Sequence, residues 1–491
     1  MNPPATLSAA VHRLLLLAAD AYRDRPATVE WLHAQRDRLD EPLRVAIAGK
    51  VKAGKSTLLN ALVGEQVAPT DAGECTRVVT WYRDGPHPRI LLHPVGGVPR
   101  PLPVRRADDR LDITLDVPAD QVDRLVVDWP TQTLRVATLI DTPGMASTST
   151  QVARRTVAFL GPEDGTPTAA DAVVYLMRHL HAADAEFLES FRDQGVGRTS
   201  GVNTVAVISR ADEIGGGRVD AMFSARGIAA RYRTEPALRG LCQDVVAVAG
   251  LLAQTGRTLR HAEYARLAEL AREPREELEE QLRTVDRFVR TGGMDTAPRH
   301  ALLERFGLFG IRLSTALIRQ GAASPAALAG ELVERSGLRE LERMLYTQFA
   351  VRRDLLKARS ALVAVHSLLR EPGPGGPPEG LAAEVERILT GAHEFTELRL
   401  LSALRSGAVT LPARHGEEAE RLLGNAGAAA VLRLGLPAEA TTEQQRAEAF
   451  VTLDRWQRHT VNPMLGRSAV DACRVVVRSC EGIVAEFDRH R

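Results

Sequence analysis

The segment 49–57, GKVKAGKST, restricts the fold of this 491-residue chain more than any other part of its sequence. It fits the pattern GxxxxGK[ST], whose context is a strand before the first glycine and a helix after the lysine. The chain supplies both, because the β-rich apolar run LRVAIA occupies 43–48 and a helical pattern covers 57–62. An ordinary glycine turn before a helix is the alternative that this segment alone leaves open.

In a loop of this kind, backbone N–H groups surround the phosphates of a nucleotide, and the dipole of the following helix favours their negative charge. Lys55 would reach the β- and γ-phosphate oxygens, and the hydroxyl of Ser56 would be a ligand of Mg²⁺. The residues predicted to contact the nucleotide here are Gly49, Lys50, Val51, Lys52, Ala53, Gly54, Lys55, Ser56 and Thr57.

Short β-rich runs recur along the first half of the chain, and helical patterns separate several of them. They lie at 136–140, 172–177, 204–208 and 245–248. Strands that alternate with helices predict an α/β fold in which a mostly parallel sheet is covered on both faces. Further strand-like runs are expected to extend one edge of the sheet, at 78–82, 90–92 and 125–127.

The segment LIDTPG puts Asp141 at the end of a predicted strand and Gly144 three residues later. A carboxylate at that place can hold Mg²⁺, usually through a water, and the glycine lets an N–H approach the γ-phosphate. Alone, DTPG is just a turn, but after a phosphate-binding loop it predicts a γ-phosphate sensor. Between the two segments, Thr76 is the best candidate for a threonine that joins Mg²⁺, and Thr70 is its rival. The predicted metal ligands are therefore Ser56, Thr76 and Asp141.

The segment VAVISRAD ends another predicted strand and carries Ser209, Arg210 and Asp212 to the carboxyl edge of the sheet, where ligands of open α/β sheets bind. The Asp212 carboxylate can accept hydrogen bonds from N1–H and the 2-amino group of guanine, which adenine does not offer as a pair of donors. The next strand end, VAVAGL, would bring backbone groups of Ala249 and Gly250 against the base. A surface RADE segment is the alternative, and by itself it would be preferred.

Residues after 249 have almost wholly helical patterns, and this change divides the chain. We expect N-terminal helices at 1–42 and a GTPase-type α/β domain at 43–349, with a helical insertion at about 256–335. Residues 350–491 are expected to form a helical bundle or stalk together with the N-terminal helices, because both parts carry unpaired apolar stripes. The proline- and glycine-rich segment 371–380 must be a loop or hairpin tip.

Charge and hydropathy exclude several classes of function. The formal net charge is +1, whereas a chain that mainly holds nucleic acid needs a strongly basic face. The sequence has no apolar stretch of about 18 residues that would span a bilayer, and residues 1–20 do not resemble a secretory signal. We therefore expect a cytoplasmic protein that does not bind nucleic acid.

The P-loop, CTR, DTPG and SRAD segments together resemble the dynamin-like GTPases. The runs GKVKAGKSTLLNALVGEQVAPTDAGECTRVVTWYR and SRADEIGGGR are most similar to the isoniazid-inducible Ini proteins of mycobacteria, nearest the IniC type. This resemblance implies a GTPase head on a helical bundle, GTP and Mg²⁺ as ligands, and pairing of heads in a homodimer or with a sister dynamin-like protein. It also implies membrane remodelling or repair, peripheral contact with the inner face of the plasma membrane, and a link to tolerance of cell-wall drugs.

The resemblance has two departures, at Val51 in the P-loop and at the expected tip 371–380, which is rich in proline and glycine where large family members carry a hydrophobic paddle or transmembrane hairpin. Val51 stands where eukaryotic dynamins carry a catalytic glutamine, and it can neither orient water nor accept its proton. Lys52 stands where guanylate-binding proteins and atlastins place an arginine finger, so it is either a catalytic cation or a solvated loop residue. The candidate catalytic residues are Lys52, Lys55 and Thr76. A GTP-binding regulatory scaffold with little hydrolysis is the alternative function.

Overall fold

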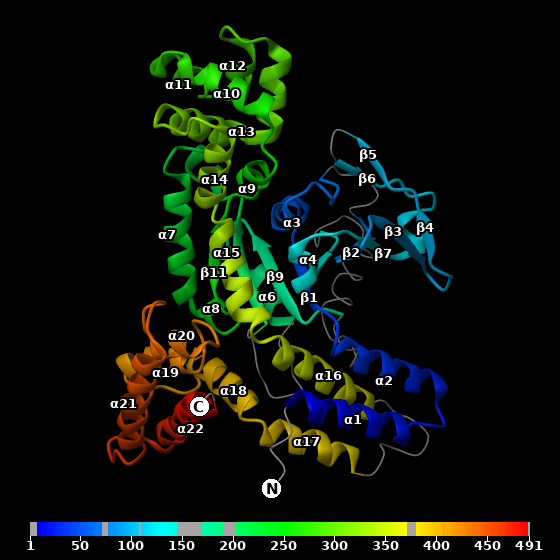
Figure 1. Cartoon of the computed structure of the whole chain (residues 1–491), viewed down its shortest axis with the longest axis vertical. Helices are drawn as coiled ribbons and strands as arrows, with labels where there is room; N and C mark the ends of the chain where they lie inside the picture. The colour runs from blue at the N-terminus through cyan, green and yellow to red at the C-terminus, as the bar shows by residue number, and fades with distance from the viewer. Residues whose placement is uncertain are drawn as a thin grey trace.

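The computed structural model describes residues 7–70, 77–107, 110–144, 169–190, 203–370, 380–405 and 407–489. A sheet with its covering helices occupies the middle of the elongated molecule (Figure 1). Helices α10 to α14, within residues 261–335, extend from one end of it, and the first and last helices of the chain lie at the other end. The mixture of a mostly parallel sheet and helices confirms the predicted α/β class.

Within the described residues, the main sheet has nine strands in the order β11-β10-β9-β1-β8-β2-β7-β3-β4. β1 pairs in parallel with β8 and β9, and β10 pairs in parallel with β9 and β11. The strand bounds are β1 Leu43–Gly49, β2 Val79–Arg83, β3 Arg89–Pro94, β4 Arg100–Leu102, β7 Val122–Asp128, β8 Ala137–Asp141, β9 Ala172–Met177, β10 Thr204–Ser209 and β11 Val245–Val248. A small separate hairpin joins β5 Arg105–Ala107 to β6 Arg110–Asp112.

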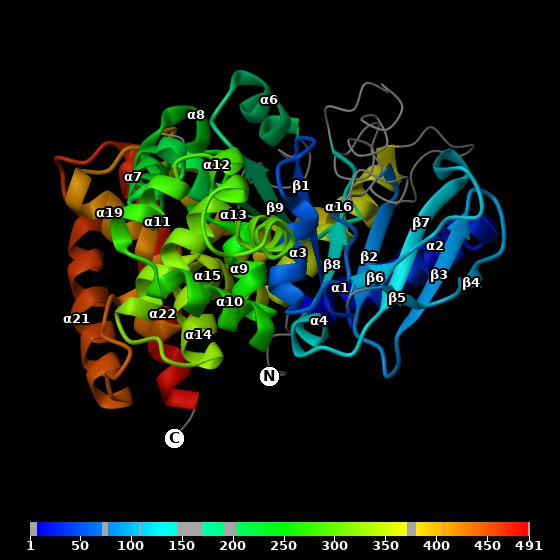
Figure 2. The ribbon, with the colours of Figure 1, turned by 90° about the horizontal axis from the view of Figure 1, so that it is seen from above.

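The edge that the sequence predicted from residues 78–82, 90–92 and 125–127 is present. β2 pairs antiparallel with β8, and β7, β3 and β4 follow beyond it. Figure 2 shows these strands on the side of the molecule opposite α7 (Ala221–Thr234).

The central strands are buried on both faces, because successive side chains point to opposite sides of the sheet. Ala46 and Ala48 belong to an apolar cluster that α7 and α13 (Thr296–Arg319) also enter. Val45 and Ile47 belong to a second cluster, with α3 (Lys55–Val63) and α15 (Leu338–Met344). The helix α15 thus packs on the sheet.

Six helices, α9 to α14, lie between β11 and α15 in the described chain. Their bounds are α9 Gly250–Arg257, α10 His261–Arg272, α11 Arg275–Gln281, α12 Val285–Arg290, α13 Thr296–Arg319 and α14 Pro325–Arg335. A nearly buried ion pair joins α13 to α10, with Arg305 Nε 2.7 Å from a carboxylate oxygen of Glu263. Phe306 and Ile311 of α13 are also buried. Residues 306–318 of α13 are all buried or partly buried.

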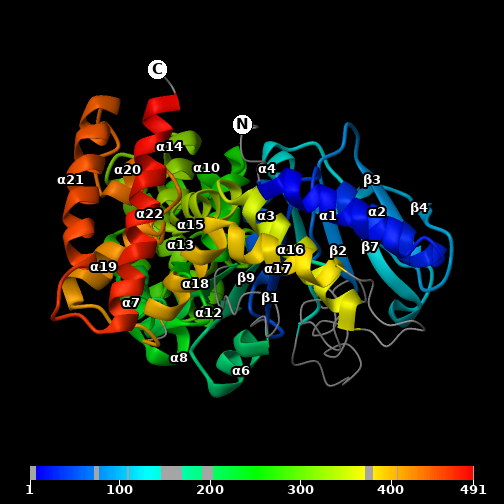
Figure 3. The same ribbon diagram turned by 90° about the horizontal axis from the view of Figure 1, so that it is seen from below.

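The first and last helices form two apolar clusters and not the single one expected from the sequence. The first joins α1 Leu7–Ala21, α2 Pro26–Arg38, α16 Arg353–Arg370, α17 Leu381–Gly391 and the start of α18 His393–Arg405. The second joins the end of α18 to α19 Ala413–Leu422, α20 Ala430–Leu434, α21 Thr442–Thr460 and α22 Arg467–Arg489. Figure 3 shows the two groups side by side, bridged by α18. The predicted hairpin tip, apart from Gly380, lies outside the described residues.

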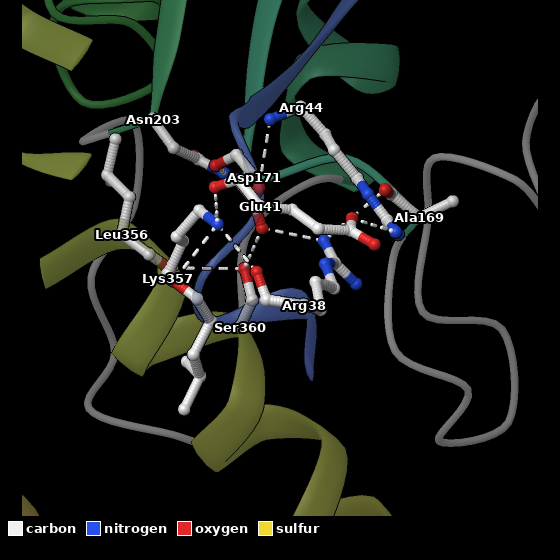
Figure 4. Close-up of polar contacts among 10 residues, drawn as sticks. Arg38, Glu41, Arg44, Ala169, Asp171, Asn203, Leu356, Lys357 and Ser360 are labelled. Atoms are coloured by element: carbon white, nitrogen blue, oxygen red, sulfur yellow. Dashed lines mark hydrogen bonds and ion pairs between the residues drawn. The ribbon is translucent and has the colours of Figure 1, made fainter. Parts of the chain in front are cut away.

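A buried polar cluster joins the sheet to the first helical group. This neck cluster consists of Arg38 on α2, Asp171 just before β9, and Lys357 and Ser360 on α16 (Figure 4). One Asp171 oxygen lies 2.6 Å from the Arg38 guanidinium and accepts from the Ser360 hydroxyl at 2.9 Å, and the other accepts from Arg44 N–H at 3.0 Å. Lys357 Nζ donates to the carbonyls of residues 38, 39 and 41.

Candidate nucleotide-binding site

The loop between β1 and α3 has the backbone that its glycines predict. Gly49 has φ +149°, and a Cβ there would lie 2.5 Å from the carbonyl oxygen of Leu176. Gly54 has φ +91° immediately before the helix. Lys52 also has a positive φ, 62°, which is uncommon for a residue with a side chain. The loop therefore turns sharply beside β9 before α3 begins.

Lys55 lies inside this loop, and only 9% of the residue is exposed. Its ammonium donates to the carbonyls of Gly49 at 3.3 Å and Lys50 at 3.4 Å. Burial lowers the pKa of Lys55, and the nearby Asp141 carboxylate opposes that shift. The ammonium is thus enclosed by the loop whose residues are predicted to contact phosphate.

The DTPG turn packs directly on the loop. Ser56 Oγ donates to one oxygen of Asp141 at 2.7 Å, which joins the two segments. Gly144 leaves no room for a side chain, because a Cβ would lie 2.5 Å from Val51 Cγ2 and 2.9 Å from Val51 N. Segments 141–144 and 49–57 are therefore in direct contact.

Asp141 fits a divalent cation. Its Oδ1 atom is buried and has no hydrogen-bond partner among the described residues. Burial raises the pKa of Asp141, although Lys55 and the Ser56 hydroxyl lower it. A cation beside this oxygen would relieve the cost of the buried carboxylate. In the described part of the chain no three His, Cys, Asp or Glu side chains form a metal cluster. The candidate Mg²⁺ ligands from protein are therefore Ser56 and Asp141, and Thr76 lies outside the described residues.

A cavity of about 160 Å³ connects the loop with two other strand ends. Gly54 and Thr57 line it from the start of α3, Asp212 from the segment after β10, and Gly250 from the start of α9. Burial raises the pKa of Asp212, with a further upward contribution from Glu213. The cavity thus brings together residues 54–57, 209–213 and 248–251, which lie far apart in the sequence.

Two residues of the SRAD segment already have partners. Ser209 is buried, and its hydroxyl donates to the Met177 carbonyl at 3.3 Å. Arg210 has φ 52° and its guanidinium lies 2.7 Å from Glu213. Both residues line the cavity.

The remaining predicted positions fall in different surroundings. The N–H of Ala249 donates to the carbonyl of Ser336 at 2.9 Å. Thr70, the alternative to Thr76, is exposed at the surface. Lys50 and Lys52 line a second cavity beside the loop, and Lys50 Nζ lies 3.0 Å from Asp184.

Sequence reasoning missed several residues around the site. Leu176 and Glu213 line the first cavity, and Asp184 is the buried partner of Lys50. Glu213 follows the SRAD motif directly, and this adjacency was an available signal. Asp184 lies in an ordinary helical pattern, and nothing in its local sequence distinguishes it.

Comparison with known proteins gives the family. The sequence profile of the Dynamin family matches residues 45–93, which contain the loop 49–57. The isoniazid-induced protein IniC of Mycobacterium tuberculosis is 44% identical over 478 residues, which cover 96% of each protein. A bacterial dynamin-like protein of Nostoc punctiforme is 33% identical over 119 residues, 21% of this chain and 17% of that protein.

A solved structure of an oligomerised bacterial dynamin pair aligns with 99% of this chain and 74% of its own, at 12% identity and a TM-score of 0.35. None of the described helices is long and apolar enough to cross a membrane. The long match to IniC confirms the resemblance found in the motifs: this chain belongs to the dynamin-like GTPase family, within the group of the isoniazid-induced protein IniC.

Proposed function

We propose that this protein binds GTP with Mg²⁺ and hydrolyses it to GDP and phosphate. The observation that carries the proposal is the cavity that joins Gly54 and Thr57 to Asp212 and Gly250. The base would lie against Asp212 and Gly250, and the phosphates would follow the loop 49–57 toward Lys55. Arg210 is partly exposed at the cavity, and its planar guanidinium would stack on the base.

Mg²⁺ would be held by Ser56 and Asp141, which are hydrogen-bonded to each other at 2.7 Å. Thr76 is the further ligand that the sequence suggests. The ion would neutralise charge on the β- and γ-phosphates. Gly144 packs against the loop at Val51, and its N–H would meet the γ-phosphate there.

Hydrolysis would depend mainly on positioned positive charge. Lys55 is the enclosed cation of the loop, and Lys52 is an exposed cation on its outer part. Thr76 or a backbone carbonyl would position the attacking water, because Val51 has no group that could do so. We therefore expect slow turnover from the isolated head.

Replacing Asp212 tests the assignment of guanine. Asp212→Asn should weaken GDP binding and shift preference toward xanthosine diphosphate, because the amide presents a donor where the carboxylate presents an acceptor. Asp220→Asn, an exposed carboxylate before α7, is the matched control and should leave both affinities unchanged. Fluorescence titration with both diphosphates measures the preference. An unchanged preference in Asp212→Asn would mean that the base is recognised elsewhere.

We further propose that GTP-bound heads pair, as a homodimer or with a sister dynamin-like protein, and that the helical groups pass this change to a membrane. Family membership supports the proposal, and the name of the relative IniC suggests a role in the response to a cell-wall drug. The protein would act in the cytoplasm, peripherally at the inner face of the plasma membrane. Specific activity that rises with protein concentration, and co-sedimentation with liposomes, would support pairing and lipid contact.

The second candidate is a GTP-binding regulatory scaffold that hydrolyses little. It is favoured by Val51, whose side chain contacts the position of Gly144 and offers no polar group beside the predicted γ-phosphate. Turnover that stays slow at every protein concentration, combined with tight GTP binding, would support this candidate.

A further inference from the structure

A second cavity, of about 320 Å³, lies beside the loop and is distinct from the cavity proposed to hold GTP. Its lining shares only Ala53 and Leu176 with the first cavity. Residues 50–53 form one wall, and the end of β9 with the segment after it forms the other. Neither Asp141 nor Asp212 lines it.

The lining of this second cavity is strongly basic. Lys50, Lys52 and Arg178 are cations, and His179 and His181 stand beside them with ring centroids 6.5 Å apart. The carboxylate among the lining residues is that of Asp184. The cavity therefore carries net positive charge even when both histidines are neutral.

Asp184, the acidic residue of this lining, already has three partners. Tyr175 Oη donates to Asp184 at 2.7 Å, and the N–H of His181 donates to it at 3.0 Å. Lys50 Nζ lies 3.0 Å from the same carboxylate, which is 1% exposed. Asp184 thus neutralises Lys50 and fixes the backbone at His181, so that the basic wall is held in place before any ligand binds.

Arg178 keeps an incomplete set of partners. Its guanidinium lies 3.0 Å from Glu213, but that carboxylate is shared with Arg210 at 2.7 Å. Half of the Arg178 side chain is exposed. Arginine presents a planar set of N–H donors that matches the oxygens of a phosphate, and histidine and lysine add further donors.

We infer that the second cavity is a binding site for inorganic phosphate, occupied by the phosphate that GTP hydrolysis releases. This inference rests on the proposed function, because the wall formed by residues 50–53 belongs to the loop that would contact the γ-phosphate. The product anion would form on one side of that loop and find cations on its other side. A phosphate-bearing lipid headgroup has the same chemistry, and the experiment distinguishes the two sources.

The test is calorimetric titration of sodium phosphate into the full-length protein saturated with GDP and Mg²⁺. Saturable binding is expected, and Arg178→Gln and His181→Gln should each weaken it, Arg178→Gln by about tenfold. Arg226→Gln, an exposed arginine on α7, is the matched control and should bind phosphate as the unaltered protein does. Lys55→Ala, in which nucleotide binding is lost, should still bind phosphate. That arm separates a failure of this inference from a failure of the proposed function.

Three results would overturn the inference. Phosphate that binds only without GDP would occupy the nucleotide site. Equal weakening in Arg178→Gln and Arg226→Gln would indicate unspecific attraction. Anionic phospholipid vesicles that bind in an Arg178-dependent manner, without binding of free phosphate, would make the headgroup the occupant.

Discussion

Removing the Asp171 carboxylate should loosen the helices that hold the GTPase head. The Asp171 side chain has no exposed surface, and it accepts from Arg38, Ser360 and Arg44 N–H. Burial would raise the pKa of Asp171, yet these partners outweigh that effect and hold it below its usual value. Asp171→Ala leaves the buried Arg38 guanidinium without its carboxylate. Breaking a buried ion pair in this way costs about 3–5 kcal/mol.

Hydrogen exchange measures this effect where it arises. If the cost falls on local opening around the neck cluster, about 3–5 kcal/mol corresponds to exchange faster by roughly two to nearly four orders of magnitude. The acceleration should appear in α2 and α16, which carry Arg38 and Ser360, and much less in α21 and α22. Asp116→Ala is the control, because its pair with Arg100 is exposed and should not affect exchange in α2 or α16.

A double substitution tests whether the two charges act as a pair. Arg38→Met combined with Asp171→Leu should be less destabilising than the sum of the two single changes, since the apolar pair leaves no uncompensated charge. Protection of α2 and α16 in Asp171→Ala that equals the unaltered protein would refute the reasoning. Strict additivity of the two single changes would refute it as well.

Three further predictions concern the backbone and the nucleotide site. Gly337→Ala should destabilise the protein by about 1 kcal/mol or more, because Gly337 has φ +80° and a Cβ would lie 2.1 Å from the Ala247 carbonyl. Gly330→Ala, at an exposed position of α14, should instead stabilise it by about 0.5–1 kcal/mol, and thermal unfolding distinguishes the two. Lys55→Ala should abolish GDP binding in a fluorescence titration, and unchanged affinity would remove the loop assignment. Burial raises the pKa of Asp141 above the ordinary aspartate value. On acidification, the Mg²⁺-dependent affinity for nucleotide should therefore begin to fall at a higher pH than an ordinary aspartate would give, and Asp141→Asn should lack this pH dependence.

The sheet and the loop 49–57 were predictable because the sequence patterns that indicate them are local. A buried parallel strand is a short apolar run, and the loop after β1 needs glycines at particular places, such as Gly49 beside the Leu176 carbonyl. The strand ends then follow from topology, because parallel strands bring their carboxyl ends to one edge. This reasoning predicted that Asp212 and Thr57 contact one nucleotide, and in the structure both line one cavity although they are 155 positions apart.

The division of the terminal helices was not predictable by the same means. An apolar stripe shows that a helix is covered on one face, but it does not identify the helix that covers it. The stripes of α1 and α22 are alike in kind, yet α1 joins α16 and α17, whereas α22 joins α19 and α21. Which stripes meet depends on the turns between helices, such as the passage through α18.

Polar partners that are distant in sequence were hidden for a related reason. Lys50 was predicted to contact phosphate because it lies in the loop motif, but its ammonium lies 3.0 Å from Asp184, 134 residues later. A carboxylate in a helical segment is usually solvated, so no local pattern sets Asp184 apart from its neighbours. Only the crossing of β9 beside β1 brings the two together, and with them the basic wall of the second cavity. A motif therefore identifies the residues that would contact a ligand. The partners that surround these residues depend on the order of the strands, which a local sequence pattern does not show.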